Sequence, residues 1–374
     1  MTLPTPFTHG LAAAAYVSPD ALAREQRLWS SAWIVVGYAR DLDAADAFLT
    51  ARLGRLEIVV QRHRDGLSAF VNRCAHRGSA LHTERRGTCA LVCPYHGWRY
   101  DGAGQPQAIP FLPPAALAIA RATPELALRR LAVESRHGLV WVCAADAPTP
   151  LVEFLGEETD NLLAAIAPLG PVAGEPFGRQ LETWSANWKT CVEGTLEGIH
   201  VPFVHASSFH AVVDAQKTEV TCHGRHLVQV TRLSSESAAW WRQFRARAGF
   251  PTSAVDPDTY THALIFPSFA VGITGGALVS TQLYTPTSAA ATELDHVQWL
   301  PTPARASAGV RAILRSVTAK LDADNRGILA EDRAAAERVQ RGLEAANDPA
   351  HRIVLALPAE QRIAHFHQAI EESV

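Results

Sequence analysis

The sequence has no long hydrophobic run and no marked excess of charge of either sign. Its apolar runs stay far short of the roughly 20 residues that a helix needs to cross a bilayer. The first residues, MTLPTPFTHGLAAAAYV, lack the positively charged region that opens a signal peptide. Lysine and arginine (34) nearly balance aspartate and glutamate (37), and no basic cluster indicates a nucleic-acid or anionic membrane face. We therefore expect a cytoplasmic protein without a membrane or nucleic-acid partner.

Dinucleotide motifs and cysteines are also scarce. No G-x-G-x-x-G follows a strand-like segment, so the chain shows no nicotinamide or flavin fingerprint of its own. Of the six cysteines, four are scattered, and we expect them to be buried free thiols: Cys89, Cys143, Cys191 and Cys222. The 374 residues, 48% of them apolar, suit one large domain or two of ordinary size.

The remaining cysteines stand in two short segments that could hold a metal. Cys74 and His76 form a Cys-x-His pair, and Cys93 and His96 form a Cys-x-x-His pair. A tetrahedral zinc site accepts two sulfurs and two nitrogens. A Rieske [2Fe–2S] cluster uses the same four ligands, with two cysteines on one iron and two histidines on the other. Because each segment supplies one sulfur and one nitrogen, the spacing favours the cluster over the usual zinc patterns.

The residues around these ligands resemble a known family. CAHRG and CPYHGW resemble the two cluster-binding boxes of Rieske proteins. Rieske proteins of respiratory and photosynthetic chains carry an extra cysteine in each box, and neither box has one here. The resemblance is therefore to the Rieske ferredoxins and oxygenases. A ferredoxin needs only about one hundred residues, so the length of this chain favours an oxygenase.

Residues 187–205, NWKTCVEGTLEGIHVPFVH, contain a second group of candidate ligands. Spacings of four and three residues predict that three side chains share one helical face: Glu193, Glu197 and His200. Pro202 is expected to end or kink this helix, which would let His205 turn back toward His200. Two imidazoles and one carboxylate would form a 2-His-1-carboxylate iron site. Taken alone, the two histidines could equally be ordinary core or surface residues.

This segment resembles the catalytic-domain box of Rieske non-haem iron oxygenases. The resemblance implies that His200 and His205 bind a mononuclear iron, and it gives Asn187 and Glu193 places in the catalytic site.

The family takes its third iron ligand from a late helix. ILAEDRAAAERVQRGL, residues 328–343, matches that element and implies Asp332 as the ligand, with Glu331 as the neighbouring alternative. Without the resemblance, the same charges would suit an exposed amphipathic helix.

The resemblance gives Glu197 a separate role. In the family, an acid at this place bridges an iron-ligating histidine, here His200, to a cluster histidine of the neighbouring subunit, here His96, across a head-to-tail homotrimer. The sequence departs from the common pattern, because the bridge is more often Asp, Gly194 stands where many relatives have Asn, and Ile199 replaces a frequent Tyr. A glutamate occurs in some relatives that act on quaternary amines and other non-aromatic substrates, which weakens the case for ring dihydroxylation.

We expect an α+β protein. Ser18 and Pro19 suit the start of an N-terminal helix, and turn residues at Arg64, Asp65 and Gly66 predict a hairpin in a small antiparallel β domain. The resemblance implies a helix-grip catalytic domain with a curved antiparallel sheet around a long helix. The predicted parts are residues 1–30, a helical segment packing with the catalytic domain, residues 31–148, the Rieske domain, and residues 149–374, the catalytic domain.

The resemblance implies the terminal component of an oxygenase system, in which a separate flavin reductase, with or without a ferredoxin, passes electrons from NAD(P)H. Hydroxylation or oxidative demethylation is favoured over cis-dihydroxylation. An electron carrier with a dead second site and a zinc-stabilised binding protein remain as alternatives. Six aromatic side chains could line a substrate pocket or simply pack in a core: Trp240, Trp241, Phe244, Phe266, Phe269 and Tyr284.

Overall fold

Two compact units make up the structure, a computed structural model that describes residues 5–172, 174–301, 303, 306–346, 348 and 350–374. Residues 29–154 form one unit, which we call the inserted unit, and residues 1–28 with 155–374 form the other, the flanking unit. In sequence, the inserted unit interrupts the flanking unit. Among the described residues, no helix is long and apolar enough to cross a membrane.

The inserted unit is built on a seven-stranded antiparallel sheet in the order β2-β10-β9-β5-β4-β3-β6. Its strands, with a separate β7-β8 pair, are β2 (Ile34–Tyr38), β3 (Ala47–Leu53), β4 (Leu56–His63), β5 (Gly66–Val71), β6 (Arg86–Thr88), β7 (Arg99–Tyr100), β8 (Pro106–Ala108), β9 (Arg130–Arg136) and β10 (Leu139–Cys143). The predicted hairpin is confirmed, because His63 pairs with Gly66 across a two-residue turn.

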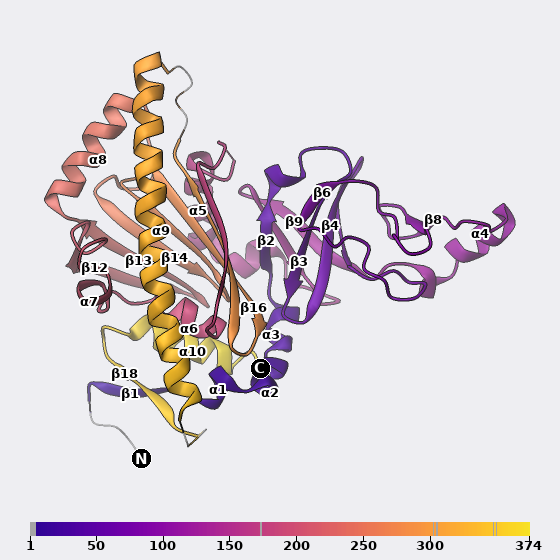
Figure 1. The fold of residues 1–374 in the computed structure, drawn as a ribbon, viewed down its shortest axis with the longest axis horizontal. Helices are drawn as coiled ribbons and strands as arrows, with labels where there is room; N and C mark the ends of the chain where they lie inside the picture. Colours follow the sequence, from indigo (N-terminus) through magenta and orange to yellow (C-terminus); the bar gives the residue numbers. More distant parts are fainter. Residues whose placement is uncertain (1–4, 173, 302, 304–305, 347, 349) are drawn as a thin grey trace. The chain divides into compact units, whose positions relative to one another are not determined.

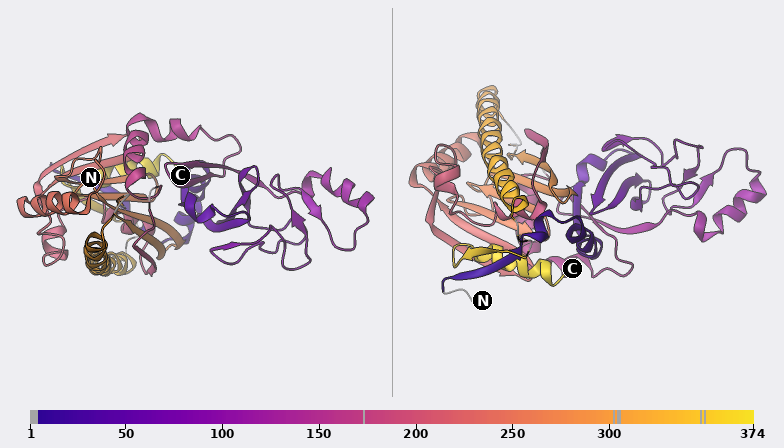
Figure 2. Two further views of the ribbon diagram at one scale, coloured as in Figure 1. Left: turned by 90° about the horizontal axis from the view of Figure 1, so that it is seen from above. Right: turned by 60° about the horizontal axis from the view of Figure 1, so that its bottom comes forward.

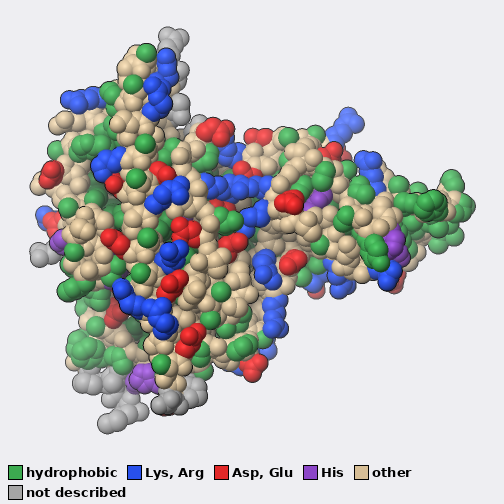
Figure 3. All heavy atoms as spheres, in the orientation of Figure 1, with side chains coloured by type: hydrophobic (Ala, Val, Ile, Leu, Met, Phe, Trp, Pro, Cys, Tyr) green, Lys and Arg blue, Asp and Glu red, His purple; other side chains and the backbone are tan. Residues whose placement is uncertain are grey.

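Short helical segments complete this unit: η1 (Ala39–Leu42), α4 (Pro114–Arg121) and η2 (Pro124–Leu126). Figure 3 shows hydrophobic side chains gathered over α4 at one end of the unit. Phe111 and Leu112, just before the helix, and Ile119 within it are exposed. Apolar patches of this kind often mark contact surfaces.

The flanking unit contains a second seven-stranded antiparallel sheet, in the order β11-β17-β16-β15-β14-β13-β12. Its strands are β11 (Gly178–Trp184), β12 (Val213–His223), β13 (His226–Leu233), β14 (Thr259–Ile265), β15 (Phe269–Thr274), β16 (Leu278–Ser288) and β17 (Ala291–Trp299). The long helix α9 (Ala308–Glu344) runs across this sheet in Figure 1. The α+β class and the helix-grip arrangement are therefore as predicted.

The other helices of the flanking unit are α1 (Ala14–Val17), α2 (Pro19–Arg24), α6 (Trp188–Glu193), α7 (Val201–Val204), α8 (Ser235–Ala248), α10 (Gln361–Glu371) and the turn η3 (Ala167–Leu169). Two more helices span the limits between the units, namely α3 (Gln26–Ser31) and α5 (Leu151–Ile166), and α5 is broken at Gly156, where φ is 70°. Ser18 caps α2 by accepting hydrogen bonds from the N–H groups of Asp20 and Ala21, with Pro19 as its first residue, as predicted.

The first and last strands of the described chain pair with each other in the flanking unit. Strand β1 (Phe7–Ala12) pairs antiparallel with β18 (Arg352–Ala356), and Figure 2 shows the pair beside α10. Further along the N-terminal segment, Glu25 accepts hydrogen bonds from Lys189 Nζ at 2.5 Å and from Trp188 Nε1 at 2.7 Å. The Lys189 side chain is fully buried and that of Glu25 is 4% exposed, so this ion pair anchors α6 from inside the core.

The four scattered cysteines are free thiols, as expected. Their expected burial is only half right, since Cys143 and Cys191 are buried whereas Cys89 and Cys222 are exposed. Cys89 follows the edge strand β6, and Cys222 lies near the end of the edge strand β12, where a side chain can face solvent.

Candidate metal centres and substrate cavity

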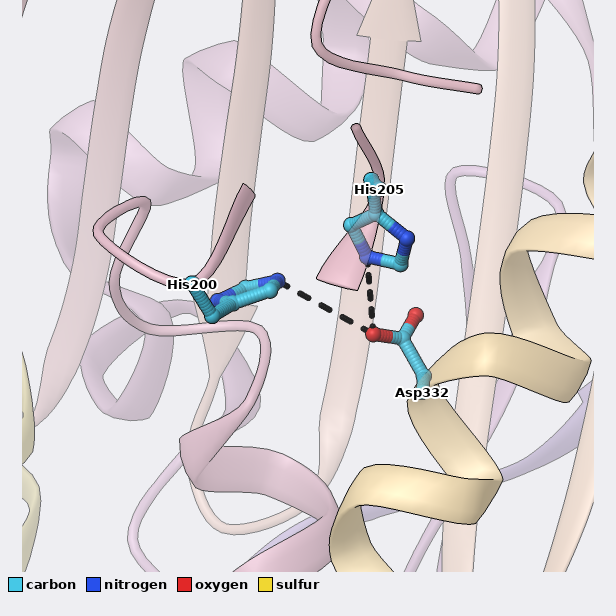
Figure 4. Close-up of side chains that lie close together, drawn as sticks. All are labelled: His200, His205 and Asp332. Carbon is cyan, nitrogen blue, oxygen red and sulfur yellow. Dashed lines mark hydrogen bonds and ion pairs between the residues drawn. The ribbon is translucent and has the colours of Figure 1, made fainter. Parts of the chain in front are cut away.

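Three predicted ligands of the second metal site lie together in the flanking unit. The Nε2 atom of His205 is 3.0 Å from Oδ1 of Asp332, and Nε2 of His200 is 3.9 Å from the same oxygen (Figure 4). One donor atom from each residue lies within 4.8 Å of those of the other two, and in the described part of the chain no other three such residues gather as closely. Two imidazoles and one carboxylate are the donor set of a facial iron triad.

The backbone brings these ligands together by a break in helical structure. The prediction of one helical face for Glu193, Glu197 and His200 is wrong, because α6 ends at Glu193 and the chain runs irregularly from there to His200. Gly194 caps the end of α6, and the Thr195 hydroxyl bonds back to the Val192 carbonyl.

Pro202 begins a helix where we expected it to end one. It lies in the first turn of α7, where its missing N–H leaves no helical bond unmade. His200 immediately precedes this single turn and His205 immediately follows it. The short helix therefore presents the two imidazoles from its two ends, and Asp332 reaches them from the C-terminal half of α9 (Figure 4).

A carboxylate holds the far nitrogen of each imidazole. Glu197 Oε1 bonds to His200 Nδ1, and its other oxygen accepts from the backbone N–H groups of Ile199 and His200. Glu331 Oε2 lies 2.7 Å from His205 Nδ1. Both rings thus keep Nε2 on the side of Asp332, the orientation that such outer carboxylates give metal-binding histidines.

Glu331 is the residue whose role sequence reasoning missed. We considered it as an alternative ligand to Asp332, but it lies on the other ring nitrogen of His205 and also accepts from Ser208 Oγ at 2.7 Å. Burial alone would lower the pKa of His205, but hydrogen bonds to Asp332 and Glu331 outweigh it and raise that pKa. The concentration of negative charge suits a divalent cation.

Two other predicted site residues make structural contacts. Asn187 caps α6, accepting from the N–H of Lys189, while its amide donates to the carbonyls of Tyr16 and Ala289. The side chain is buried, and it is absent from the described lining of the cavity beside the triad. Its contacts are those of a residue that fixes the start of α6.

Glu193 lies in a buried network that joins distant parts of the sequence. Its Oε1 accepts from the Tyr16 hydroxyl at 2.7 Å and from His367 Nε2 at 2.8 Å. Because His367 Nδ1 accepts from the N–H of Leu11, its proton lies on Nε2. Burial, reinforced by Glu193, raises the pKa of Tyr16 well above its usual range. The network connects α6 to the N-terminal segment and to α10.

A cavity of about 860 Å³ opens beside the triad and has His200, His205 and Asp332 in its lining. None of the six aromatic residues named above lies in that lining, and five of them are buried in packed cores. The core-packing alternative therefore holds for those five. The aromatic side chains that do line the cavity are Phe203, Phe209 and Tyr260.

The four predicted cluster ligands lie on two loops of the inserted unit, in two chemically distinct pairs. Cys74 and Cys93 are buried and lie within hydrogen-bonding reach of each other. The rings of His76 and His96 meet edge to face with centroids 4.8 Å apart. In the described chain, no three of the four donor atoms gather within 4.8 Å. Paired sulfurs beside paired imidazoles fit two irons with different ligands better than one tetrahedral zinc.

Matching turns shape the two loops. The N–H of Gly78 donates to the Cys74 carbonyl, and the N–H of Gly97 donates to the Cys93 carbonyl. Both glycines have positive φ, 77° and 70°, which a residue with a side chain adopts at a cost. Burial would raise the pKa of Cys93, but backbone N–H donors following it lower that pKa overall, which favours the thiolate that iron binds.

Tyr100 contributes a further hydrogen bond at the first loop. Its hydroxyl lies 3.1 Å from Cys74 Sγ and accepts from the N–H of Ala75. Trp98 stacks on His76 and Tyr95 stacks on His96. The cysteines are thus buried and hydrogen-bonded, while each imidazole is exposed and has one aromatic ring stacked on it.

The two sites define a protein with a Rieske cluster domain and a separate 2-His-1-carboxylate iron domain. Comparison with known families agrees: residues 32–126 match the Rieske [2Fe-2S] domain and residues 175–374 match the ring hydroxylating alpha subunit (catalytic domain). The chain belongs to the family of ring-hydroxylating alpha subunits.

Individual relatives differ in the reactions that their names state. The chain is 28% identical over 282 residues to the large subunit of anthranilate 1,2-dioxygenase from Burkholderia cepacia, covering 67% of this chain and 64% of that one. It is 32% identical over 230 residues to the oxygenase subunit of glycine betaine monooxygenase from Chromohalobacter salexigens, covering 58% and 46%. The crystal structure of the quaternary ammonium Rieske monooxygenase CntA shares the fold, with a TM-score of 0.76, 20% identity and coverage of 100% and 99%.

Proposed function

We propose that this protein is the terminal oxygenase of a Rieske non-haem iron system, which hydroxylates or oxidatively demethylates a small organic substrate with O2. The observation that carries the proposal is the triad of His200, His205 and Asp332 in the wall of a cavity of about 860 Å³. A cavity of this size can hold a small molecule next to the metal.

The residues of this chain divide the work between two centres. Cys74, His76, Cys93 and His96 would hold the [2Fe–2S] cluster, and His200, His205 and Asp332 would hold the mononuclear iron. With three protein ligands, a bound iron keeps open positions where O2 can be activated next to the substrate. The protein fixes the rings through Glu197 and Glu331 and surrounds the substrate with the cavity wall.

Electrons would come from NAD(P)H through an external flavin reductase, with or without a ferredoxin. Glu197 is proposed to connect His200 with His96 of a neighbouring copy in a homotrimer. Its hydrogen bond to His200 Nδ1 supports the His200 half of this route. Glu193 and Asn187 are proposed to act on the site by fixing α6, which leads into the ligand loop. Dependence on NAD(P)H supports a cytoplasmic location.

Aromatic-ring cis-dihydroxylation is the second candidate, since it uses the same iron site and several relatives are named 1,2-dioxygenases. The cavity favours the first candidate, because its lining includes Gln229, Thr231, Ser280 and Gln282, which suit a polar substrate. A pure electron carrier is the alternative of another class, and an intact triad beside a cavity argues against it.

The test is metal analysis of anaerobically purified protein together with oxygen uptake. We expect about three irons per chain, a Rieske EPR signal after reduction, and substrate-dependent O2 consumption with a reductase. The His200→Ala variant should lose turnover and keep the visible spectrum of the cluster. Two irons per chain without O2 uptake would indicate the carrier, and zinc in a colourless protein would refute the cluster.

A further inference from the structure

The wall of the substrate cavity has a buried cation behind it. Arg362, on α10, is 1% exposed. Its Nη1 donates to Gln229 Oε1 at 2.9 Å and, at 3.4 Å, to the Thr195 carbonyl, and its Nη2 donates to His262 Nδ1 at 2.9 Å. All three partners are neutral. In the part of the chain that the structure describes, Nε of Arg362 has no hydrogen-bond partner.

This guanidinium has no carboxylate to neutralise it among the described residues that bond to it or shift its pKa. Burial lowers the pKa of Arg362 to about 10, so the side chain stays charged at neutral pH. A buried charge without a counterion is costly, and proteins rarely keep one unless something else compensates it.

His262 connects Arg362 to the cavity, because it bonds to Arg362 and also lines the cavity. It is 4% exposed and forms part of the cavity lining. Because Nδ1 accepts from Arg362, the proton of the neutral ring lies on Nε2. Burial and the charge of Arg362 keep the pKa of His262 well below its usual range. Nε2 is buried and has no partner among the described residues, so a hydrogen-bond donor lacks an acceptor here.

Neighbouring strands place polar residues around this donor. In the register of the sheet, Gln229, His262, Gly272 and Ser280 stand side by side on β13 to β16, and all four line the cavity. Gly272 leaves the space above Tyr260 open, since a Cβ there would approach the Tyr260 ring to 3.3 Å.

Tyr260 relates this region to the metal site. Burial raises the pKa of its phenol to about 12, and Arg362 and Asp332 act on it in opposite directions. The phenol therefore lies within the influence of both the buried cation and the metal ligand. A molecule held at His262 would present another part of itself to the triad, because both line the same cavity.

We propose that the substrate is a carboxylate-bearing small molecule, whose anionic group accepts a hydrogen bond from His262 Nε2 and is neutralised by Arg362 behind it. The proposal rests on the oxygenase function and adds its substrate class. An anion supplies both the acceptor that His262 lacks and the counterion that Arg362 lacks. A cationic group at the same place would be repelled by Arg362 and would meet a donor.

The test is calorimetric binding of benzoate and its neutral isostere benzamide to the iron-loaded, anaerobic protein, with tetramethylammonium as the cationic probe. We expect benzoate to bind about ten-fold or more tighter than benzamide, the gain of one charge-assisted hydrogen bond. The His262→Phe and Arg362→Met variants should abolish this preference, and Arg362→Lys should restore part of it. Arg352→Met is the matched control, because Arg352 is exposed and pairs with Glu371.

Benzoate and benzamide of equal affinity, or tighter binding of tetramethylammonium, would overturn the proposal. A benzoate preference that survives both His262→Phe and Arg362→Met would also overturn it, since that preference would then come from the iron. If Arg362→Met does not fold, His262→Phe decides, because it removes the donor and leaves the bonds of Arg362 to Gln229 and Thr195.

Oxygen uptake separates this proposal from the oxygenase function. A benzoate preference that depends on His262, in a protein without substrate-driven O2 uptake, would support the anion site and refute the oxygenase. O2 uptake driven by neutral or cationic substrates alone would support the oxygenase function and refute the anion site.

Discussion

Removing the carboxylate of Glu331 should weaken the mononuclear metal site without touching a metal ligand. Glu331 Oε2 lies 2.7 Å from His205 Nδ1 and 2.7 Å from Ser208 Oγ. A hydrogen bond to a charged group contributes about 1.5–3 kcal/mol, and loss of such an outer partner typically costs about 10–100-fold in metal affinity. We therefore expect Glu331→Ala to bind Fe(II) about 10–100-fold more weakly than the unchanged protein. The affinity of Glu331→Gln, which keeps an amide oxygen, should lie between those of Glu331→Ala and the unchanged protein.

The assay is an anaerobic titration of chelator-treated protein with Fe(II) against a competing dye, with the visible spectrum of the cluster as a measure of intact protein. Asp324→Asn is the matched control, since Asp324 is on the same helix, exposed, and paired with Lys320. Unchanged Fe(II) affinity in Glu331→Ala would refute the reasoning. If Asp332→Ala kept its iron while Glu331→Ala lost it, the ligand would be Glu331.

Three further perturbations probe the core, the cluster and the response to acid. Glu25→Gln should destabilise the protein by roughly 3–5 kcal/mol in urea unfolding, because Lys189 would remain buried without its ion-pair partner. Combining it with Lys189→Met should restore most of the lost stability. A urea midpoint that does not fall in the single variant would contradict this reasoning. Tyr100→Phe removes a hydrogen bond to Cys74 Sγ and should lower the reduction potential of the cluster by about 40 mV, the equivalent of about 1 kcal/mol for one electron, whereas an equal or higher potential would count against the contact. Burial lowers the pKa of His296 to about 4, below its ordinary value of 6.5, so the unfolded chain takes up the proton first and stability should fall as pH drops from about 6.5 toward 4; urea midpoints that fall equally in His296→Gln would show that other groups cause the loss.

Short-range patterns in the sequence single out the candidate ligands. The candidate cluster ligands could be recognised as two pairs, Cys74 with His76 and Cys93 with His96, because each pair lies in a tight turn. The glycine of each turn is visible in the sequence: Gly78 two residues after His76, and Gly97 one residue after His96. A tight turn is formed by residues close together in the sequence, so it can be recognised from a short sequence pattern.

The surroundings of the ligands depend on contacts that spacing does not record. Helical periodicity placed Glu193 on the same face as Glu197, but Gly194 ends the helix between them, and Glu193 instead meets Tyr16 and His367 from opposite ends of the chain. Glu331 could be noticed in the sequence as a candidate. That its carboxylate binds Nδ1 of His205 depends on how α9 packs against α7, which the sequence does not show.

Because residues 29–154 interrupt the flanking unit, the two units cannot complete their folding at the same time during synthesis at the ribosome. Every strand of the inserted unit has been made by Cys143, whereas β1 must wait for β18 near the other end of the chain. At usual elongation rates the intervening residues take roughly 10–40 s to appear. During that interval the apolar side chains of Leu11 and Tyr16, buried in the finished protein, have no partners, and a nascent chain can acquire its iron–sulfur cluster before its second iron site exists. The inserted unit can therefore fold while the flanking unit is still incomplete.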